Sequence, residues 1–149
     1  MTAGQPAAVV VVRLVPAPPD VVYAEWTNPE AFREWMCPRP AVATGIAVDP
    51  RPGGKLRIDI EDRGQEFFVA GEYLTVDPPS TLSFTWWCST WPIDTPTSVV
   101  TVSFEARPGA ATLMTIRHEQ LPDHLLQQHE TGWRVIAGQL AARTHSSTA

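Results

Sequence analysis

The sequence has few charged residues and no long apolar run, and each shortage excludes a class of protein. Charged residues make up 18% of the 149 positions, and the formal net charge is −5. Phosphate binding needs clustered lysine and arginine, so no nucleic-acid partner is expected. No window approaches the roughly 20 apolar residues that cross a bilayer, so no membrane span is expected.

Cysteine is also scarce, with only Cys37 and Cys88. Two cysteines do not make a disulfide framework, so a reduced, cytoplasmic protein is predicted. The amino terminus, MTAGQPAAVVVV, lacks the basic region of a signal peptide. No base stands beside Cys37 in the sequence to activate its thiol, and we interpret it as a small buried hydrophobic residue.

Motifs for metals, cofactors and catalysis are missing as well. His129-Glu130 begins like a zinc-protease helix, but Trp133 occupies the position of the required second histidine. His124 is five residues from His129, which places the two on different helical faces. Walker, dinucleotide-binding and G-x-S-x-G patterns are absent. We therefore expect no metal, no cofactor and no recognisable catalytic set.

The chain instead contains a series of elements separated by turn residues. Residues 8–15 are rich in valine and end at a proline, which predicts a first strand. Residues 18–20 open a short helix, and Asn28-Pro29 can cap and start a second. Apolar and polar residues then alternate in five runs: 56–60, 67–73, 82–86, 100–104 and 112–118. Such runs predict an antiparallel sheet with one buried face.

The only long helix is predicted over residues 122–143. Its apolar positions recur at helical spacing: Leu125, Leu126, Trp133, Ile136 and Leu140. We therefore predict an α+β helix-grip fold, in which a six- to seven-stranded antiparallel sheet curls around one long C-terminal helix. Two short helices follow strand 1. The single domain should span residues 7–143, with flexible termini at 1–6 and 144–149.

An ordered set of short motifs accompanies these elements: Trp26-Thr27, Pro29, Trp35 with Pro38, Gly53-Gly54, Gly71-Glu72-Tyr73, Phe84-Thr85-Trp86, His118, and His129 with Gly132-Trp133. In this order the chain resembles the helix-grip superfamily of START and birch-pollen-allergen domains. Within it, residues 9–140 resemble homologues of the C-terminal domain of the heat-shock-protein-90 ATPase activator. Met36 is a departure, because that family often carries a second tryptophan there.

The resemblance implies a cavity between the sheet and the long helix, suited to a small hydrophobic ligand. The wider superfamily includes polyketide cyclases and aromatases, so the resemblance also allows enzymatic use of the cavity. The residues expected to line it are Trp35, Phe67, Tyr73, Phe84, Trp86, Val100, Met114, His118, His129 and Trp133.

Two histidines each have two interpretations. His118 is in register with Met114 on the inward face, where it could bind a ligand or act as an acid or base. Alternatively, it is a strand-end histidine bonded to backbone or to the Glu119-Gln120 loop. His129 shares a helical face with Trp133, either as the main polar group of the cavity or as a boundary residue.

The tryptophans near residue 86 suggest both a wall and an interface. Trp86 should face inward, whereas Trp87 should be exposed on the outer face of the sheet and suggests an interface such as that of a homodimer. The loop at residues 91–94 could cover the cavity or the partner surface. Gly132 inside the long helix costs about 1 kcal/mol relative to alanine, which indicates a close helix–sheet approach or room for a ligand.

Three functions remain open from the sequence. The first is a binding or carrier protein for a small hydrophobic or aromatic molecule. The second is a cyclase, dehydratase or hydrolase that uses His118, His129 or Tyr73 as an acid or base. The third is a chaperone-associated interaction module that uses Trp87 and the outer sheet face.

Overall fold

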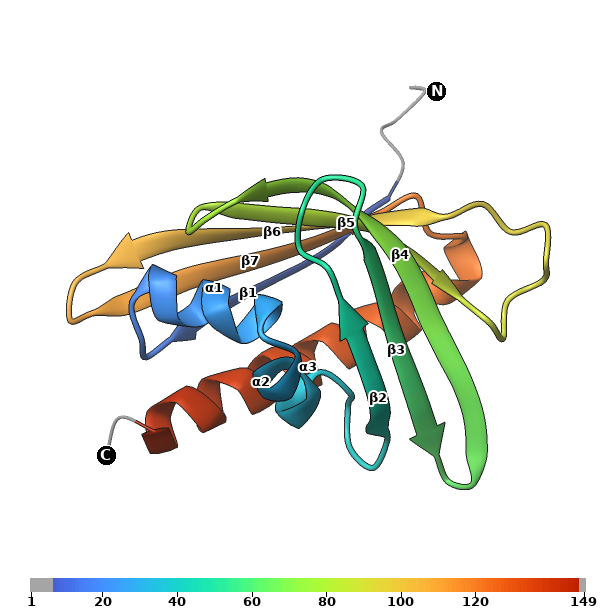
Figure 1. Ribbon diagram of the computed structural model, residues 1–149, viewed down its shortest axis with the longest axis horizontal. Helices are drawn as coiled ribbons and strands as arrows, with labels where there is room; N and C mark the ends of the chain where they lie inside the picture. The colour runs from blue at the N-terminus through green and yellow to red at the C-terminus, as the bar shows by residue number, and fades with distance from the viewer. Residues whose placement is uncertain (1–6, 148–149) are drawn as a thin grey trace.

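Seven antiparallel strands form one strongly curled sheet in this computed structural model, which describes residues 7–147 (Figure 1). The spatial order is β1-β7-β6-β5-β4-β3-β2. The strands are β1 (Val9–Val15), β2 (Val42–Val48), β3 (Lys55–Asp62), β4 (Gln65–Asp77), β5 (Thr81–Cys88), β6 (Ser98–Arg107) and β7 (Ala111–Glu119). The terminus expected to be flexible at residues 1–6 lies outside the described residues, as do the last two residues of the one expected at 144–149; residues 144–147 belong to the last helix.

Two short helices and one long helix complete the fold. Helices α1 (Pro19–Thr27) and α2 (Pro29–Trp35) connect β1 to β2. A single 3-10 turn, Asp123–Leu125, precedes α3 (Leu126–Ser147), which crosses the concave side of the sheet (Figure 1). The predicted α+β helix-grip class is confirmed, and the sheet has seven strands, within the predicted six to seven.

The break between α1 and α2 follows from one residue. The Asn28 side chain accepts hydrogen bonds from the backbone N–H groups of Glu30 and Ala31 at 3.0 and 3.2 Å. Asn28 has extended backbone angles, and Pro29 follows at the first helical position. An asparagine cap satisfies backbone donors that a helix start leaves unpaired, so the chain stops one helix and begins another here.

Two elements differ from the sequence prediction. The alternation gave no separate run for β2, because a bulge between Ala43 and Gly45 shifts its register against β3. Helix α3 continues to Ser147, four residues past the predicted end. Thr144 is buried in this last turn, and its hydroxyl donates to the carbonyl of Leu140 at 3.1 Å.

The interior beneath α1 and α2 is filled by aromatic rings around Trp26. Its ring centroid lies 4.9 Å from that of Trp35 and 6.2 Å from that of Trp133. Phe84 and Phe104 complete the contact at 6.3 and 6.4 Å. Rings at these separations make favourable edge and offset contacts and bury large apolar areas. This half of the grip is therefore a packed core rather than a pocket.

Polar contacts fix α3 to the two short helices. The Gln139 amide donates to the carbonyls of Trp35 and Cys37 at 2.9 and 2.8 Å, and accepts from the backbone N–H of Arg39 at 3.1 Å. Farther along, Arg143 forms an ion pair with Glu25 at 2.6 Å. The turn after α2 is thus held directly against the long helix.

The outer face of β1 is apolar. Val10, Val12 and Leu14 are 40%, 52% and 57% exposed, although their neighbours Val9 and Val11 are buried. β1 is an edge strand that pairs only with β7. Residues of β1 alternate between buried and exposed positions, but most residues at both kinds of position are apolar.

Strand β4 comes unusually close to its neighbour β5 at Gly71. A Cβ atom at Gly71 would lie 1.8 Å from the carbonyl oxygen of Thr85, far inside van der Waals contact. The neighbouring Glu72 N–H donates to the Thr85 hydroxyl at 2.9 Å, which holds the two strands together here. Only glycine allows so close an approach of two backbones.

We expect Gly71→Ala to destabilise the protein by about 3 kcal/mol, because the added methyl group must push the strands apart. Gly138→Ala is the matched control. Its added Cβ meets nothing within 4 Å, and alanine favours a helix by up to about 1 kcal/mol. Urea unfolding followed by circular dichroism gives the free energy of unfolding of both variants. Equal values would contradict the role of Gly71 in the close approach of β4 and β5.

Candidate functional site

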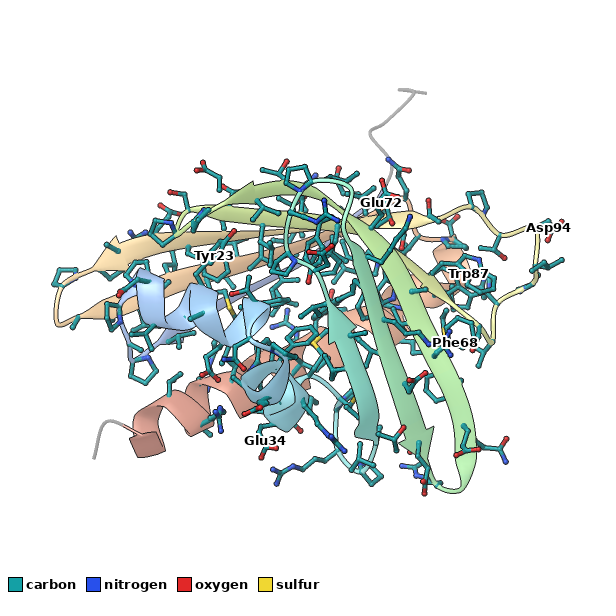
Figure 2. The ribbon with its side chains drawn as sticks, viewed as in Figure 1. Tyr23, Glu34, Phe68, Glu72, Trp87 and Asp94 are labelled. Atoms are coloured by element: carbon teal, nitrogen blue, oxygen red, sulfur yellow. The ribbon has the colours of Figure 1, made fainter. Side chains whose placement is uncertain are left out.

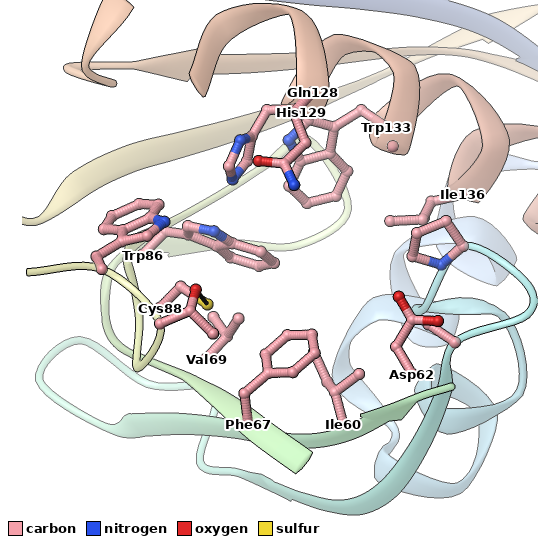
Figure 3. A pocket seen from close by; sticks show the side chains of 15 residues that line it. Ile60, Asp62, Phe67, Val69, Trp86, Cys88, Gln128, His129, Trp133 and Ile136 are labelled. Carbon is pink, nitrogen blue, oxygen red and sulfur yellow. Dashed lines mark hydrogen bonds between the residues drawn. The ribbon is translucent and has the colours of Figure 1, made fainter. Parts of the chain in front are cut away.

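A cavity of about 340 Å³ lies between the sheet and α3, on the side of Trp133 away from the α1–α2 core. Strand residues line one side, with residues of α3 opposite (Figure 3). Its lining residues are Pro38, Ala41, Ile60, Asp62, Phe67, Val69, Trp86, Cys88, Thr90, Trp91, Gln128, His129, Gly132, Trp133 and Ile136. The walls are mainly apolar and aromatic, as in most small-molecule sites.

The structure brings four of the ten predicted residues to this cavity: Phe67, Trp86, His129 and Trp133. The other six are buried but do not line it: Trp35, Tyr73, Phe84, Val100, Met114 and His118. An inward-facing position on a strand or helix selects both groups equally. The aromatic cluster around Trp26 then fills the space near Trp35 and Phe84, so those side chains pack against protein.

His118 is fully buried and bonded on both ring nitrogens. The indole Nε1–H of Trp133 donates to His118 Nδ1 at 3.0 Å. Because an indole can only donate, Nδ1 must be the unprotonated nitrogen. His118 Nε2–H therefore donates to the Ser98 hydroxyl at 2.7 Å, which in turn donates to the carbonyl of Trp86 at 2.8 Å. These three hydrogen bonds are therefore all donated in the same direction, from α3 toward the sheet.

This arrangement favours neutral His118. Burial, with a smaller contribution from nearby His129, lowers the pKa of His118 to about 3. Protonation of Nδ1 would also remove the acceptor that Trp133 requires. His118 thus differs from both interpretations made from the sequence, because it neither lines the cavity nor bonds to the Glu119-Gln120 loop. It joins α3 to β6 and β7.

His129 lines the cavity and keeps one ring nitrogen free for it. Its Nδ1–H donates to the carbonyl of Leu125 one turn back, at 3.0 Å. Nε2, across the ring, has no hydrogen-bond partner among the described residues and is not a fully buried atom. Burial lowers the pKa of His129, partly opposed by its bond to Leu125. Near neutral pH it presents an unprotonated acceptor.

Trp86 carries a buried donor. Its side chain is 8% exposed, and its Nε1–H has no hydrogen-bond partner within residues 7–147. The indole stands beside His118 and Trp133, with ring centroids 5.7 and 5.2 Å away. Unpaired buried donors are uncommon in folded proteins. Here the donor belongs to a residue that lines a cavity.

Trp87 faces outward as predicted, but it is half-buried rather than exposed. Its Nε1–H donates to the carbonyl of Thr95 at 3.0 Å, so the loop after β5 folds back over the indole. Phe68 lies beside it (Figure 2). The Arg57 guanidinium lies 3.9 Å from the centroid of the Phe68 ring. Trp91 of the same loop turns inward and lines the cavity.

Other candidates for chemistry are buried, although Cys88 also lines the cavity. Cys37 and Cys88 are free, buried thiols, and burial raises the pKa of Cys37 to about 12, so its thiol stays protonated at neutral pH. Burial likewise raises the pKa of Tyr73. Met36, at the family's tryptophan position, is buried in the core and does not line the cavity.

Several lining residues were not selected from the sequence. Ile60, Val69 and Ile136 lie on faces whose apolar periodicity was visible, so a wider reading of the same pattern would have included them. Asp62 and Gln128 carried no such signal. Asp62 ends β3 beside a turn, and Gln128 lies in the first turn of α3, where the sequence shows only a polar position.

A curled antiparallel sheet around one long helix, with a cavity between them, defines a helix-grip domain. Residues 16–144 match the family described as Activator of Hsp90 ATPase homolog 1-like protein, and the chain belongs to that family. No curated protein matches the chain.

Solved structures share the fold over nearly the whole chain. Protein CV1439 from Chromobacterium violaceum is 25% identical, with a TM-score of 0.83 over 92% of this chain and 96% of its own. Protein NE0264 from Nitrosomonas europaea is 21% identical, with a TM-score of 0.81 over 95% and 96%. A protein from Rhizobium leguminosarum is 25% identical, with a TM-score of 0.75 over 94% and 95%.

No helix between residues 7 and 147 is long and apolar enough to cross a membrane. Within the same range, no three His, Cys, Asp or Glu side chains are grouped so that they could hold a metal ion.

Neutral His118 should make stability depend on pH. An unfolded histidine titrates near pH 6.5, whereas folded His118 resists protonation down to about pH 3. Its contribution is therefore complete above pH 6.5 and is lost as the pH falls, by about 2 kcal/mol between pH 7 and pH 5. His118→Gln keeps a donor and an acceptor but cannot titrate. Urea unfolding at both pH values should show a flatter dependence for this variant, and identical slopes would contradict the assignment.

Proposed function

We propose that this protein binds a small, largely apolar molecule in the cavity between the sheet and α3. The supporting observation is the contrast within the interior of the grip. Aromatic rings fill one half, whereas an open volume of about 340 Å³ remains beside Trp86 and Trp133. This volume is at the lower end of the roughly 300–1,000 Å³ typical of ligand sites, which favours a ligand of two or three rings.

Gly132 supports the same proposal. It lines the cavity, and an added Cβ would meet nothing within 4 Å, so the glycine does not serve a close helix–sheet contact. The close-approach interpretation from the sequence is therefore wrong, and the room for a ligand remains. A glycine inside a helix lowers stability, and here its position keeps the volume open.

The cavity supports binding better than catalysis. An acid–base enzyme needs titratable groups placed around one reacting centre. His118 and Tyr73 lie outside the lining, and His129 is the one histidine in it. The interaction-module alternative relied on an exposed Trp87, whose indole is instead half-buried and bonded to the loop after β5.

Filling the cavity at Gly132 should abolish binding. We expect Gly132→Leu to weaken binding of 2-methylnaphthalene at least tenfold, because the leucine side chain would occupy the ligand volume. Gly138→Leu is the matched control, since Gly138 lies on the same helix, is equally unobstructed and does not line the cavity. Isothermal titration calorimetry with protein in the syringe gives both affinities. Equal weakening by the two variants, or none by Gly132→Leu, would contradict the proposal.

A further inference from the structure

We infer that the ligand is a protonated amine with an aromatic body, bound with its ammonium group beside Asp62 at the rim of the cavity. This inference rests on the proposed function and specifies the charge of the ligand. Asp62 is the one acidic side chain among the residues that line the cavity, and none of those residues is lysine or arginine. Its place in the sheet and its lack of a partner carry the argument.

Asp62 occupies an inward-facing position at the end of β3. The inward residues before it in this strand, Leu56, Ile58 and Ile60, are buried and apolar. The residue between them and Asp62, Glu61, is exposed on the outer face. A carboxylate therefore interrupts the apolar pattern where the strand reaches the cavity. The Asp62 side chain is 39% exposed, so it lies at the boundary between the cavity and solvent.

The Asp62 carboxylate accepts no hydrogen bond from the described residues. Oδ1 is enclosed and unpaired, whereas Oδ2 is not a fully buried atom, so an N–H group of a ligand can approach it. Arg63 Nε lies 3.8 Å from Oδ1, beyond hydrogen-bond length, on a side chain that is 78% exposed. An aspartate that begins a turn ordinarily accepts a backbone N–H of that turn. Asp62 precedes the Arg63-Gly64 turn without such a bond, so turn formation does not account for it.

The other polar groups of the lining supply no positive charge to balance Asp62. Thr90 and Gln128 are uncharged. Burial lowers the pKa of His129, which is therefore neutral near pH 7. The cavity is thus negatively charged, and it attracts a cation and repels a carboxylate or phenolate. The net charge of −5 on the whole chain acts in the same direction.

The aromatic walls fit the body of such a ligand. Trp86 stands across the cavity from Asp62, and Phe67 lies on the strand side (Figure 3). Aromatic faces attract both apolar rings and cations. An arylalkylamine can therefore place its ring system against the tryptophans and its ammonium group at the rim, in contact with Asp62 and with water. In this orientation neither charge is fully buried, which avoids most of the desolvation cost.

The test compares three naphthalenes that differ in charge: 2-(2-naphthyl)ethylamine, 2-(2-naphthyl)ethanol and 2-naphthylacetate. At pH 7 they are a cation, a neutral molecule and an anion. We expect the wild-type protein to bind the amine about fivefold more tightly than the alcohol, as for a partly exposed ion pair. The acetate should bind more weakly than the alcohol by a similar factor. Isothermal titration calorimetry at low ionic strength gives each affinity.

Salt provides a second measurement on the wild-type protein. Raising the ionic strength from about 0.1 M to about 1 M shortens the Debye length from about 10 Å to about 3 Å. The advantage of the amine over the alcohol should then fall at least twofold. Affinity for the alcohol should not decrease, because the burial of apolar surface is not screened by salt.

Two substitutions assign the preference to one residue. Asp62→Asn keeps the size of the side chain and removes its charge, so the amine should lose its advantage over the alcohol. Affinity for the alcohol itself should change less than twofold. Glu61→Gln is the matched control, because it changes the net charge equally at an exposed neighbour that does not line the cavity. This variant should retain the advantage of the amine. The salt comparison stands even if Asp62→Asn fails to fold.

The outcomes separate the two proposals. If 2-methylnaphthalene or the alcohol binds and the amine binds no more tightly than the alcohol, the amine inference is wrong while the apolar cavity stands. The same holds if the acetate matches the amine, or if Glu61→Gln and Asp62→Asn reduce the advantage equally. If neither 2-methylnaphthalene nor any of the three test compounds binds, the proposed binding function itself is overturned.

Discussion

The hydrogen bond from the Trp133 indole to His118 determines much of this structure. It joins the long helix to the sheet in a region otherwise held by apolar contacts, which alone would tolerate sliding or rotation. Because the indole only donates, the bond also sets the histidine tautomer and, through it, the direction of the Ser98 bond. The fixed Trp133 ring then separates the packed core from the open cavity.

The helix grip is consequently divided into two halves with different tasks. Toward α1 and α2, rings around Trp26 give a dense core, and Gln139 reinforces it with three hydrogen bonds to the turn after α2. On the other side of Trp133, Gly132 has no side chain to fill the space, and the cavity remains open. The packed core and the cavity in which we propose binding thus lie on opposite faces of one tryptophan.

The sequence predicted the architecture more completely than the site. Alternating strands, the Asn28 cap and the helical stripe each arise from local chemistry, and all three appear in the structure. The cavity lining depends on which inward side chains compete for space. Trp86 and Phe84 point to the same face of one strand, yet only Trp86 lines the cavity, because Trp26 contacts Phe84 from the other side. Similarly, nothing local to His118 indicates that Trp133 would be its partner.

The apolar outer face of edge strand β1 has a consequence for the protein's behaviour in acid. Val10, Val12 and Leu14 form an exposed apolar stripe on the outer face of β1, where the surface of another chain could pack. Mutual repulsion from the net negative charge opposes such association at neutral pH. Acidification protonates carboxylates and so reduces the net negative charge. It also destabilises the fold, because His118 is protonated more readily in the unfolded chain. Charge repulsion between molecules and the stability of the fold therefore decrease together as the pH falls. We expect self-association to begin in mildly acidic buffers.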